Sequence, residues 1–157
     1  MKTDTRSAAL HRLRSLAHLL DNAIPIPGTS YRIGIDPIVG LLPGGGDLVM
    51  AAFSVYIVWE SARLGLPRST VIQMVSNLVL DTVIGTVPVA GDLLDVTWKA
   101  NIKNIRLLEA HIDSPQHQKK ADKGFVLLLL FGFLALVIGI ATLSVFVIGL
   151  VWNAIVR

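Results

Sequence analysis

An uncharged stretch near the C-terminus constrains the fold more than any other feature of the chain. Residues 125–155 contain no charged side chain, and Lys123 and Arg157 bracket them. About 20 apolar residues cross the hydrocarbon core of a bilayer, so this stretch is long enough to span one with tilt. Over the whole chain 53% of the residues are hydrophobic, which is more than an ordinary soluble fold carries. The sequence predicts a membrane protein with a transmembrane helix over residues 125–156.

Small residues follow one face of this predicted helix. They recur at spacings of three, four and three, and they are Gly132, Ala135, Gly139 and Thr142. Small side chains allow a partner helix to approach closely, although glycine is common in membrane helices in general. This face is therefore a candidate helix-packing seam, and self-association is the role it suggests.

A twelve-residue pattern, D-x3-G-x2-P-x2-G-D, occurs twice, over residues 36–47 and again over residues 81–92. Both copies lie in hydrophobic sequence. Their shared positions include the helix breakers Pro43, Gly46, Pro88 and Gly91. Because proline and glycine interrupt helices and aspartate begins them, each copy predicts a helix, a break and a second helix opened by the Gly-Asp pair.

The aspartates of the two copies have two interpretations. Asp47 and Asp92 follow the breaks, where a carboxylate accepts the unpaired N–H groups of a helix start. Alternatively, the two breaks meet about a pseudo-two-fold axis and form a path for a cation or a proton, as discontinuous helices do in transporters. The carboxylates of such a paired site are Asp36, Asp47, Asp81 and Asp92. The sequence leaves both interpretations open.

A polar stripe runs along the helix that precedes the second break. Gln73, Asn77 and Asp81 are spaced by four residues, and such a stripe must face protein or water, not lipid. Hydrogen bonding between helices explains it as well as a proton path does. Arg32 takes the position of Asn77 in the first copy and can pair with Asp36 or Asp81. A fixed guanidinium favours a structural ion pair over a conducting cation site.

The rest of the chain divides into three parts. Residues 1–22 predict an amphipathic helix, which either lies in the membrane interface or docks on the protein's own core. Residues 23–112 hold the two repeats and predict a duplicated helical-hairpin membrane module, whose last helix we expect over residues 93–111. Residues 113–124 form a polar linker.

Basic residues gather in three groups: before the first motif copy, between the copies, and before the last helix. Beside apolar segments, such groups indicate cytoplasmic loops that face anionic lipid. The chain carries a net charge of +3 but no base-reading motif, so we expect no nucleic-acid partner. We predict a cytoplasmic N-terminus, Pro-Gly-Asp tips that point into or across the membrane, and a C-terminus on the far side, with lipid as the partner.

No catalytic or metal-binding constellation is recognisable. The chain has no cysteine, and the two histidines His11 and His18 by themselves are weak evidence for a metal site. The G-x-G-D string of intramembrane aspartyl proteases ends at Asp47, but the second copy does not repeat it and the other elements of that family are missing. We predict no enzymatic activity, no metal and no cofactor.

The motifs resemble those of a known family. The strings that carry the resemblance lie between Leu20 and Glu109, and they comprise Leu20-Asp21, residues 26–29, residues 32–47 and residues 88–92. They closely resemble a family of small microbial membrane proteins defined as domain of unknown function 4112. The resemblance implies a membrane-embedded module and transfers no activity or catalytic residue. The predicted C-terminal helix lies outside it.

These features favour an all-α, non-enzymatic integral membrane protein whose repeats form an oligomerising or scaffolding module. The alternative is a small ion or proton-coupled transporter or channel with paired intramembrane aspartates. The two differ at Asp81, because a proton path needs a titratable group there and a scaffold does not.

Overall fold

Five helices and one short two-stranded ribbon make up the part of the chain that the structure describes. A computed structural model describes residues 2–29, 32–35, 39, 46–85, 98–114 and 119–156. The elements are α1 (Lys2–Asn22), β1 (Ile24–Pro25), β2 (Arg32–Ile33), α3 (Gly46–Arg63), α4 (Arg68–Gly85), α6 (Ala100–Asp113) and α7 (Lys123–Ile155). The all-α prediction is confirmed, and the structure adds a minor β ribbon that the sequence does not predict.

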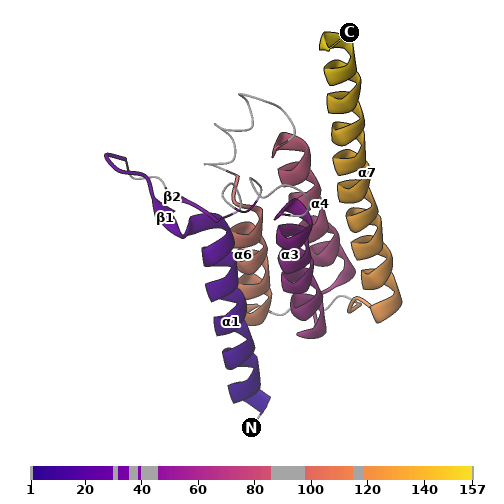
Figure 1. Cartoon of the computed structure of the whole chain (residues 1–157). Coiled ribbons are helices and arrows are strands. Elements are labelled where there is room, and N and C mark those ends of the chain that lie inside the picture. Colours follow the sequence, from indigo (N-terminus) through magenta and orange to yellow (C-terminus); the bar gives the residue numbers. More distant parts are fainter. Residues whose placement is uncertain are drawn as a thin grey trace.

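The α3–α4 turn, the start of α7 and the N-terminal turns of α1 lie at one end of the bundle, which we call the basic end (Figure 1). Arg68, which begins α4, pairs with Asp122, which precedes α7. Arg6 of α1 reaches the same end and donates to the Leu64 carbonyl at 3.4 Å. The exposed cations gathered here are Arg6, Arg63, Arg68, Lys119, Lys120 and Lys123. The chain thus brings basic residues from its three predicted groups to one end.

α1 is docked on the bundle by its apolar face. Leu13, Ala17 and Leu20 are at most 1% exposed, and their spacing of four and three puts them on one side of the helix. That side packs against α6 and α3. Of the two placements that the sequence leaves open, docking on the protein's own core is the one observed.

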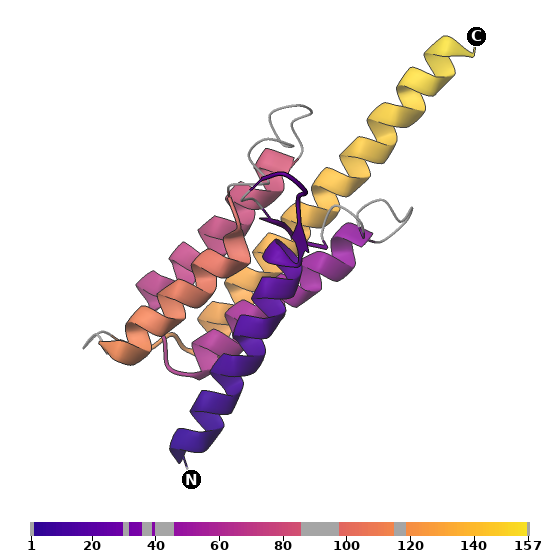
Figure 2. The same cartoon turned by 90° about the vertical axis from the view of Figure 1, so that its left-hand side faces the viewer.

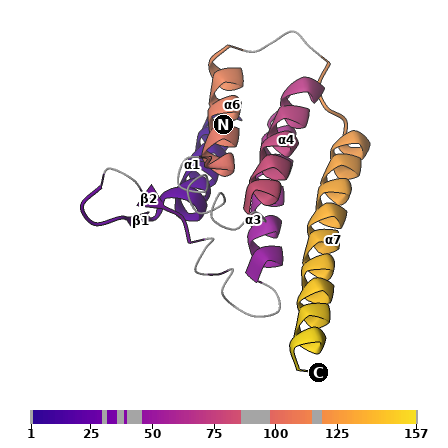
Figure 3. The ribbon, with the colours of Figure 1, turned by 90° about the horizontal axis from the view of Figure 1, so that it is seen from above.

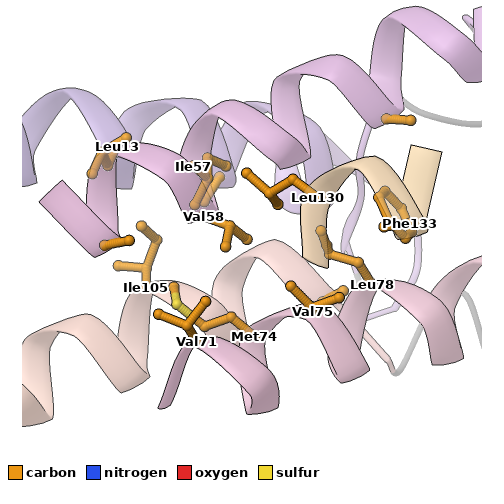
Figure 4. Packing of buried hydrophobic residues seen from close by; sticks show 14 of the residues in the cluster. Leu13, Ile57, Val58, Val71, Met74, Val75, Leu78, Ile105, Leu130 and Phe133 are labelled. Atoms are coloured by element: carbon orange, nitrogen blue, oxygen red, sulfur yellow. The ribbon is translucent and has the colours of Figure 1, made fainter. Parts of the chain in front are cut away.

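α3 and α4 form a central hairpin, with α1 and α6 on one side and α7 on the other (Figure 3). Ile57 and Val58 of α3 and Met74 and Leu78 of α4 belong to one buried cluster (Figure 4). The turn between the helices contains Gly65 with a φ of 105°, a backbone conformation that favours glycine. This hairpin is the core on which the other helices pack.

α7 is docked over its first half only. Val126, Leu130, Phe133 and Val137 are buried against α3 and α4 at spacings of four, three and four. The C-terminal part of the helix extends past the bundle (Figure 2), and the side chains that follow Val137 are largely exposed. Within the described residues, α7 is the one helix that is long and apolar enough to cross a membrane.

The two motif copies are described only in part. α3 begins at Gly46, where the sequence predicts the helix after the first break, and Asp81 lies inside α4. Asp36, Pro43, Pro88, Gly91 and Asp92 lie outside the described residues. The helix expected over residues 93–111 differs from its prediction, because Trp98 and Lys99 are not helical and α6 begins at Ala100.

Candidate functional site

The start of α6 is capped by a residue of α1. One oxygen of Asp21, Oδ2, accepts the Ile102 backbone N–H at 2.8 Å, and the other accepts the Asn101 side-chain amide at 2.8 Å. Lys99, at the N-cap position, has a left-handed backbone (φ 33°) and makes no side-chain cap bond. Because the first N–H groups of a helix lack partners within it, the carboxylate from α1 supplies what the local sequence does not.

Burial and hydrogen bonding act on Asp21 in opposite directions. The side chain lies in the core at 8% exposure, and this burial raises the pKa of Asp21 above its ordinary value. The hydrogen bonds from Asn101 and Ile102 and the charge of Lys99 act to lower the same pKa, with a smaller effect. Asp21 is therefore a carboxylate in a low-dielectric site that its partners stabilise incompletely.

Arg32 and Gly34 fasten the ribbon to the end of α1. Arg32 donates from Nε to the Asn22 carbonyl at 3.0 Å and from Nη2 to the Ala23 carbonyl at 3.5 Å. A Cβ on Gly34 would lie 1.3 Å from the Leu20 carbonyl oxygen, so the two backbones touch there. Arg32 thus satisfies carbonyls at a helix C-terminus, while its predicted pairing with Asp36 falls outside the described residues.

Asn77 joins α4 to α6. Its side-chain amide donates to Asn104 Oδ1 at 2.8 Å, and Asn104 donates in turn to the Met74 carbonyl at 3.1 Å. Trp98 donates from its indole to the Asn77 carbonyl at 3.2 Å. Hydrogen bonding between helices accounts for Asn77, the middle residue of the polar stripe.

A shallow groove of about 430 Å³ lies beside this junction. Its lining comes from α4 and α6 and consists of Gln73, Asn77, Lys103, Arg106 and Leu107. The Lys103 ammonium lies 2.9 Å from the centre of the Trp98 ring. Burial lowers the pKa of Lys103, the charge of Asp81 raises it, and the charge of Arg106 lowers it further. Two cations and one carboxylate therefore surround the groove.

The first two thirds of the chain identify its family. A model of the family described as domain of unknown function DUF4112 matches residues 9–112. The chain belongs to this family. Comparisons with curated proteins and with solved structures found no match. The DUF4112 segment covers most of α1 and all of α3, α4 and most of α6, so the Asp21 cap, the Arg32 and Gly34 contacts and the groove all belong to it, whereas α7 lies outside.

The paired aspartate site predicted within the DUF4112 segment stays a prediction. Asp81 is half-buried in α4 and close enough to Lys103 to influence its pKa. Asp47 is described as a backbone position in the first turn of α3, and Asp36 and Asp92 lie outside the described part of the chain. Of the four carboxylates, Asp81 alone has a described side chain.

The seam of small residues lies on the open side of α7, outside the DUF4112 segment. Gly132, Ala135, Gly139 and Thr142 are all exposed, whereas the docked face of the same helix is buried. Thr142 donates its hydroxyl to the Ile138 carbonyl of its own helix at 2.7 Å. Within the described chain the seam faces outward, as a surface for another helix would.

Sequence reasoning missed three of the buried polar residues of the DUF4112 bundle, Asp21, Asn101 and Asn104. A signal was present, because each falls on the apolar face of its helix. Asp21 follows Ala17 by four residues, and Asn104 precedes the buried Leu108 by four. A polar residue at a core position of an amphipathic helix needs a buried partner, and here the partners come from other helices.

Proposed function

We propose that this protein is a non-enzymatic, single-span membrane protein whose DUF4112 bundle is held at the bilayer by α7 and serves as an oligomerising or scaffolding unit. The observation that carries the proposal is the division of α7 into a docked half and a free half. The free half, residues 138–155, measures roughly 27 Å at 1.5 Å per residue. This length is close to the ~30 Å thickness of a bilayer's hydrocarbon core.

The charges on the outer helices support a placement in which only the free half of α7 lies in the hydrocarbon core. Arg14 of α1 and Glu109 of α6 form an ion pair at 2.5 Å with side chains 51% and 30% exposed. Glu109 lies in the last turns of α6 (Ala100–Asp113), and this end of α6 lies at the same end of the bundle as the start of α7 (Figure 1). Exposed charges are costly in hydrocarbon, so the docked half belongs outside it. Trp152, 68% exposed near the end of α7, suits the far interface, where tryptophan is enriched.

Single-cysteine labelling tests the anchor. The chain has no cysteine, so Lys120→Cys at the basic end and Val156→Cys after α7 each report one position. In sealed vesicles an impermeant thiol reagent should reach one of the two positions and leave the other protected until the membrane is opened. Equal access to both from the same side would contradict a spanning α7.

Self-association through the seam is the second part of the proposal. A Cβ added to Gly139 would meet no heavy atom within 4 Å, so Gly139→Leu leaves the fold of one copy intact and blocks close approach by another helix. Energy transfer between labelled copies in liposomes should fall several-fold. Ser144→Leu is the matched control, because Ser144 is exposed and lies on the opposite face of α7. Equal loss in both variants would argue against the seam.

A transporter is the alternative that Asp81 favours, because this residue is half-buried beside the groove. Liposomes containing the wild type or Asp81→Asn separate the two functions. A scaffold gives no proton or cation flux in either, whereas a proton path gives flux that the substitution removes.

A further inference from the structure

The groove between α4 and α6 combines opposite chemical characters. Lys103 and Arg106 contribute cationic ends and long aliphatic stems, Leu107 is apolar, and Gln73 and Asn77 contribute amides. The long stems line a groove while their charged ends stay accessible. Such a lining fits an amphiphile with an anionic group better than it fits a free metal cation or a purely apolar molecule.

The charges around the groove are not balanced. At Lys103 the charge of Asp81 favours the charged form and has the larger effect, while the charge of Arg106 disfavours it. Lys103 also lies over the Trp98 ring, which favours its charge through a cation–π contact. Two cations against one carboxylate leave a positive site, and an anion placed between the two cations would relieve their repulsion.

The position of the groove indicates the source of that anion. Trp98 bonds to Asn77, so α6 begins at the level of Asn77, and α4 continues beyond this level to Gly85 in the direction of the free half of α7 (Figure 1). Leu80 is 45% exposed on this continuation. It follows Gln73 and Asn77 by seven and three residues, which puts it above the groove on the same helix face. The cations Lys103 and Arg106 therefore lie towards the basic end, and the apolar Leu80 lies towards the free half of α7.

We propose that this groove binds the anionic phosphate headgroup of a membrane phospholipid, with its glycerol and the start of an acyl chain along Leu80. The phosphate oxygens accept from Lys103 and Arg106, and the amide of Gln73 donates to the headgroup. That the phosphate comes from a lipid rests on the membrane anchoring proposed above. The groove itself does not depend on it.

Native mass spectrometry of the full chain in non-ionic detergent tests this site. The sample receives phosphatidylglycerol and phosphatidylcholine in equal amounts. The wild type should retain phosphatidylglycerol preferentially. The double variant Lys103→Gln with Arg106→Gln should weaken this retention about tenfold or more, because each cation near an anionic headgroup contributes to the affinity for the lipid. Arg12→Gln with Lys119→Gln is the control, because it removes the same charge from exposed positions outside the groove. Equal retention by the groove variant, or equal loss in the control, would overturn the site.

Two further arms keep the result interpretable. In the first, Arg106→Glu alone changes an exposed side chain and keeps the contact between Lys103 and Trp98. This variant should keep the helical content of the wild type by circular dichroism. It should lose phosphatidylglycerol at least as strongly as the double variant does. Inorganic phosphate is added as a competitor, and displacement of the lipid by millimolar phosphate would assign the groove to free phosphate and overturn the headgroup proposal. Flotation with phosphatidylcholine vesicles reports anchoring separately, because the groove variants should still float through α7.

Discussion

The carboxylate of Asp21 and the backbone N–H of Ile102 join the end of α1 to the start of α6 at 2.8 Å. The same carboxylate holds Asn101, which is fully buried. Since Lys99 makes no cap bond of its own, α6 depends on α1 for its first turn. The two outer helices of the DUF4112 bundle are therefore coupled through one side chain.

Asp21→Ala should lower the free energy of unfolding by about 2 to 4 kcal/mol, because it removes a helix cap and leaves the buried Asn101 amide without its acceptor. Chemical unfolding of the detergent-solubilised chain, followed by circular dichroism, measures the change. Asp113→Ala is the matched control on an exposed aspartate and should stay within about 0.5 kcal/mol of the wild type. A similar small effect at Asp21 would show that α6 does not need the cap.

The raised pKa of Asp21 predicts a fall in stability with rising pH. The folded chain holds the Asp21 proton more tightly than the unfolded chain, whose pKa is near the ordinary 3.8. The free energy of unfolding should therefore decrease as the pH rises from 3.8 through the raised pKa. Asp21→Asn cannot ionise and should remove this decrease in unfolding curves collected across the acid range. If the variant keeps the same slope, another group is responsible.

Asp122 should behave in the opposite way. The N–H of Phe125 and the side chain of Arg68 hold the pKa of Asp122 below its ordinary value of 3.8. The contribution of the ionised Asp122 carboxylate to the free energy of unfolding is therefore present above pH 3.8 and is lost as the pH falls through the lowered pKa. Asp122→Asn should therefore flatten the loss of stability at the acid end, where Asp21→Asn has little effect. Thermal unfolding of both variants at matched pH values compares them directly.

Gly34→Ala should destabilise the fold more than ordinary glycine substitutions do. Its Cβ would lie 1.3 Å from the Leu20 carbonyl oxygen, so the ribbon or the last turn of α1 has to move, at a cost of several kcal/mol. Gly124→Ala is the control, because its Cβ would meet Asp122 at an ordinary 3.5 Å. Comparable melting temperatures for the two variants would mean that the ribbon moves away freely.

Two phenylalanines of α7 offer a matched pair for testing the docked half. Phe133 is 4% exposed and Phe131 is 66% exposed. Phe133→Ala should cost about 3 to 5 kcal/mol through the cavity it leaves, and it should loosen α7 from the bundle. Phe131→Ala should leave the docking intact. Limited proteolysis near Lys119 and Lys120 reports the release of α7, and faster cleavage in both variants would contradict the assigned docked face.

The sequence by itself determined the helices and the special role of the last one. The apolar face of α1 and the uncharged run in α7 are local patterns. Helical periodicity and the length needed to cross a bilayer are properties of neighbouring residues along the chain, so they can be recognised in the sequence before the fold is known. The all-α class and the family followed from such local features.

Only the tertiary structure decided which polar residues meet. Asp21 and Asn101 are 80 positions apart in the chain, and no local pattern indicates that α1 caps α6 or that α6 therefore begins at Ala100. The same holds for Asn77, whose partner Asn104 is 27 positions away, and for Arg32, which the sequence pairs with carboxylates and the fold places on the carbonyls that end α1. A buried polar group must find a partner, but sequence alone does not say which one, because that choice depends on how the helices pack.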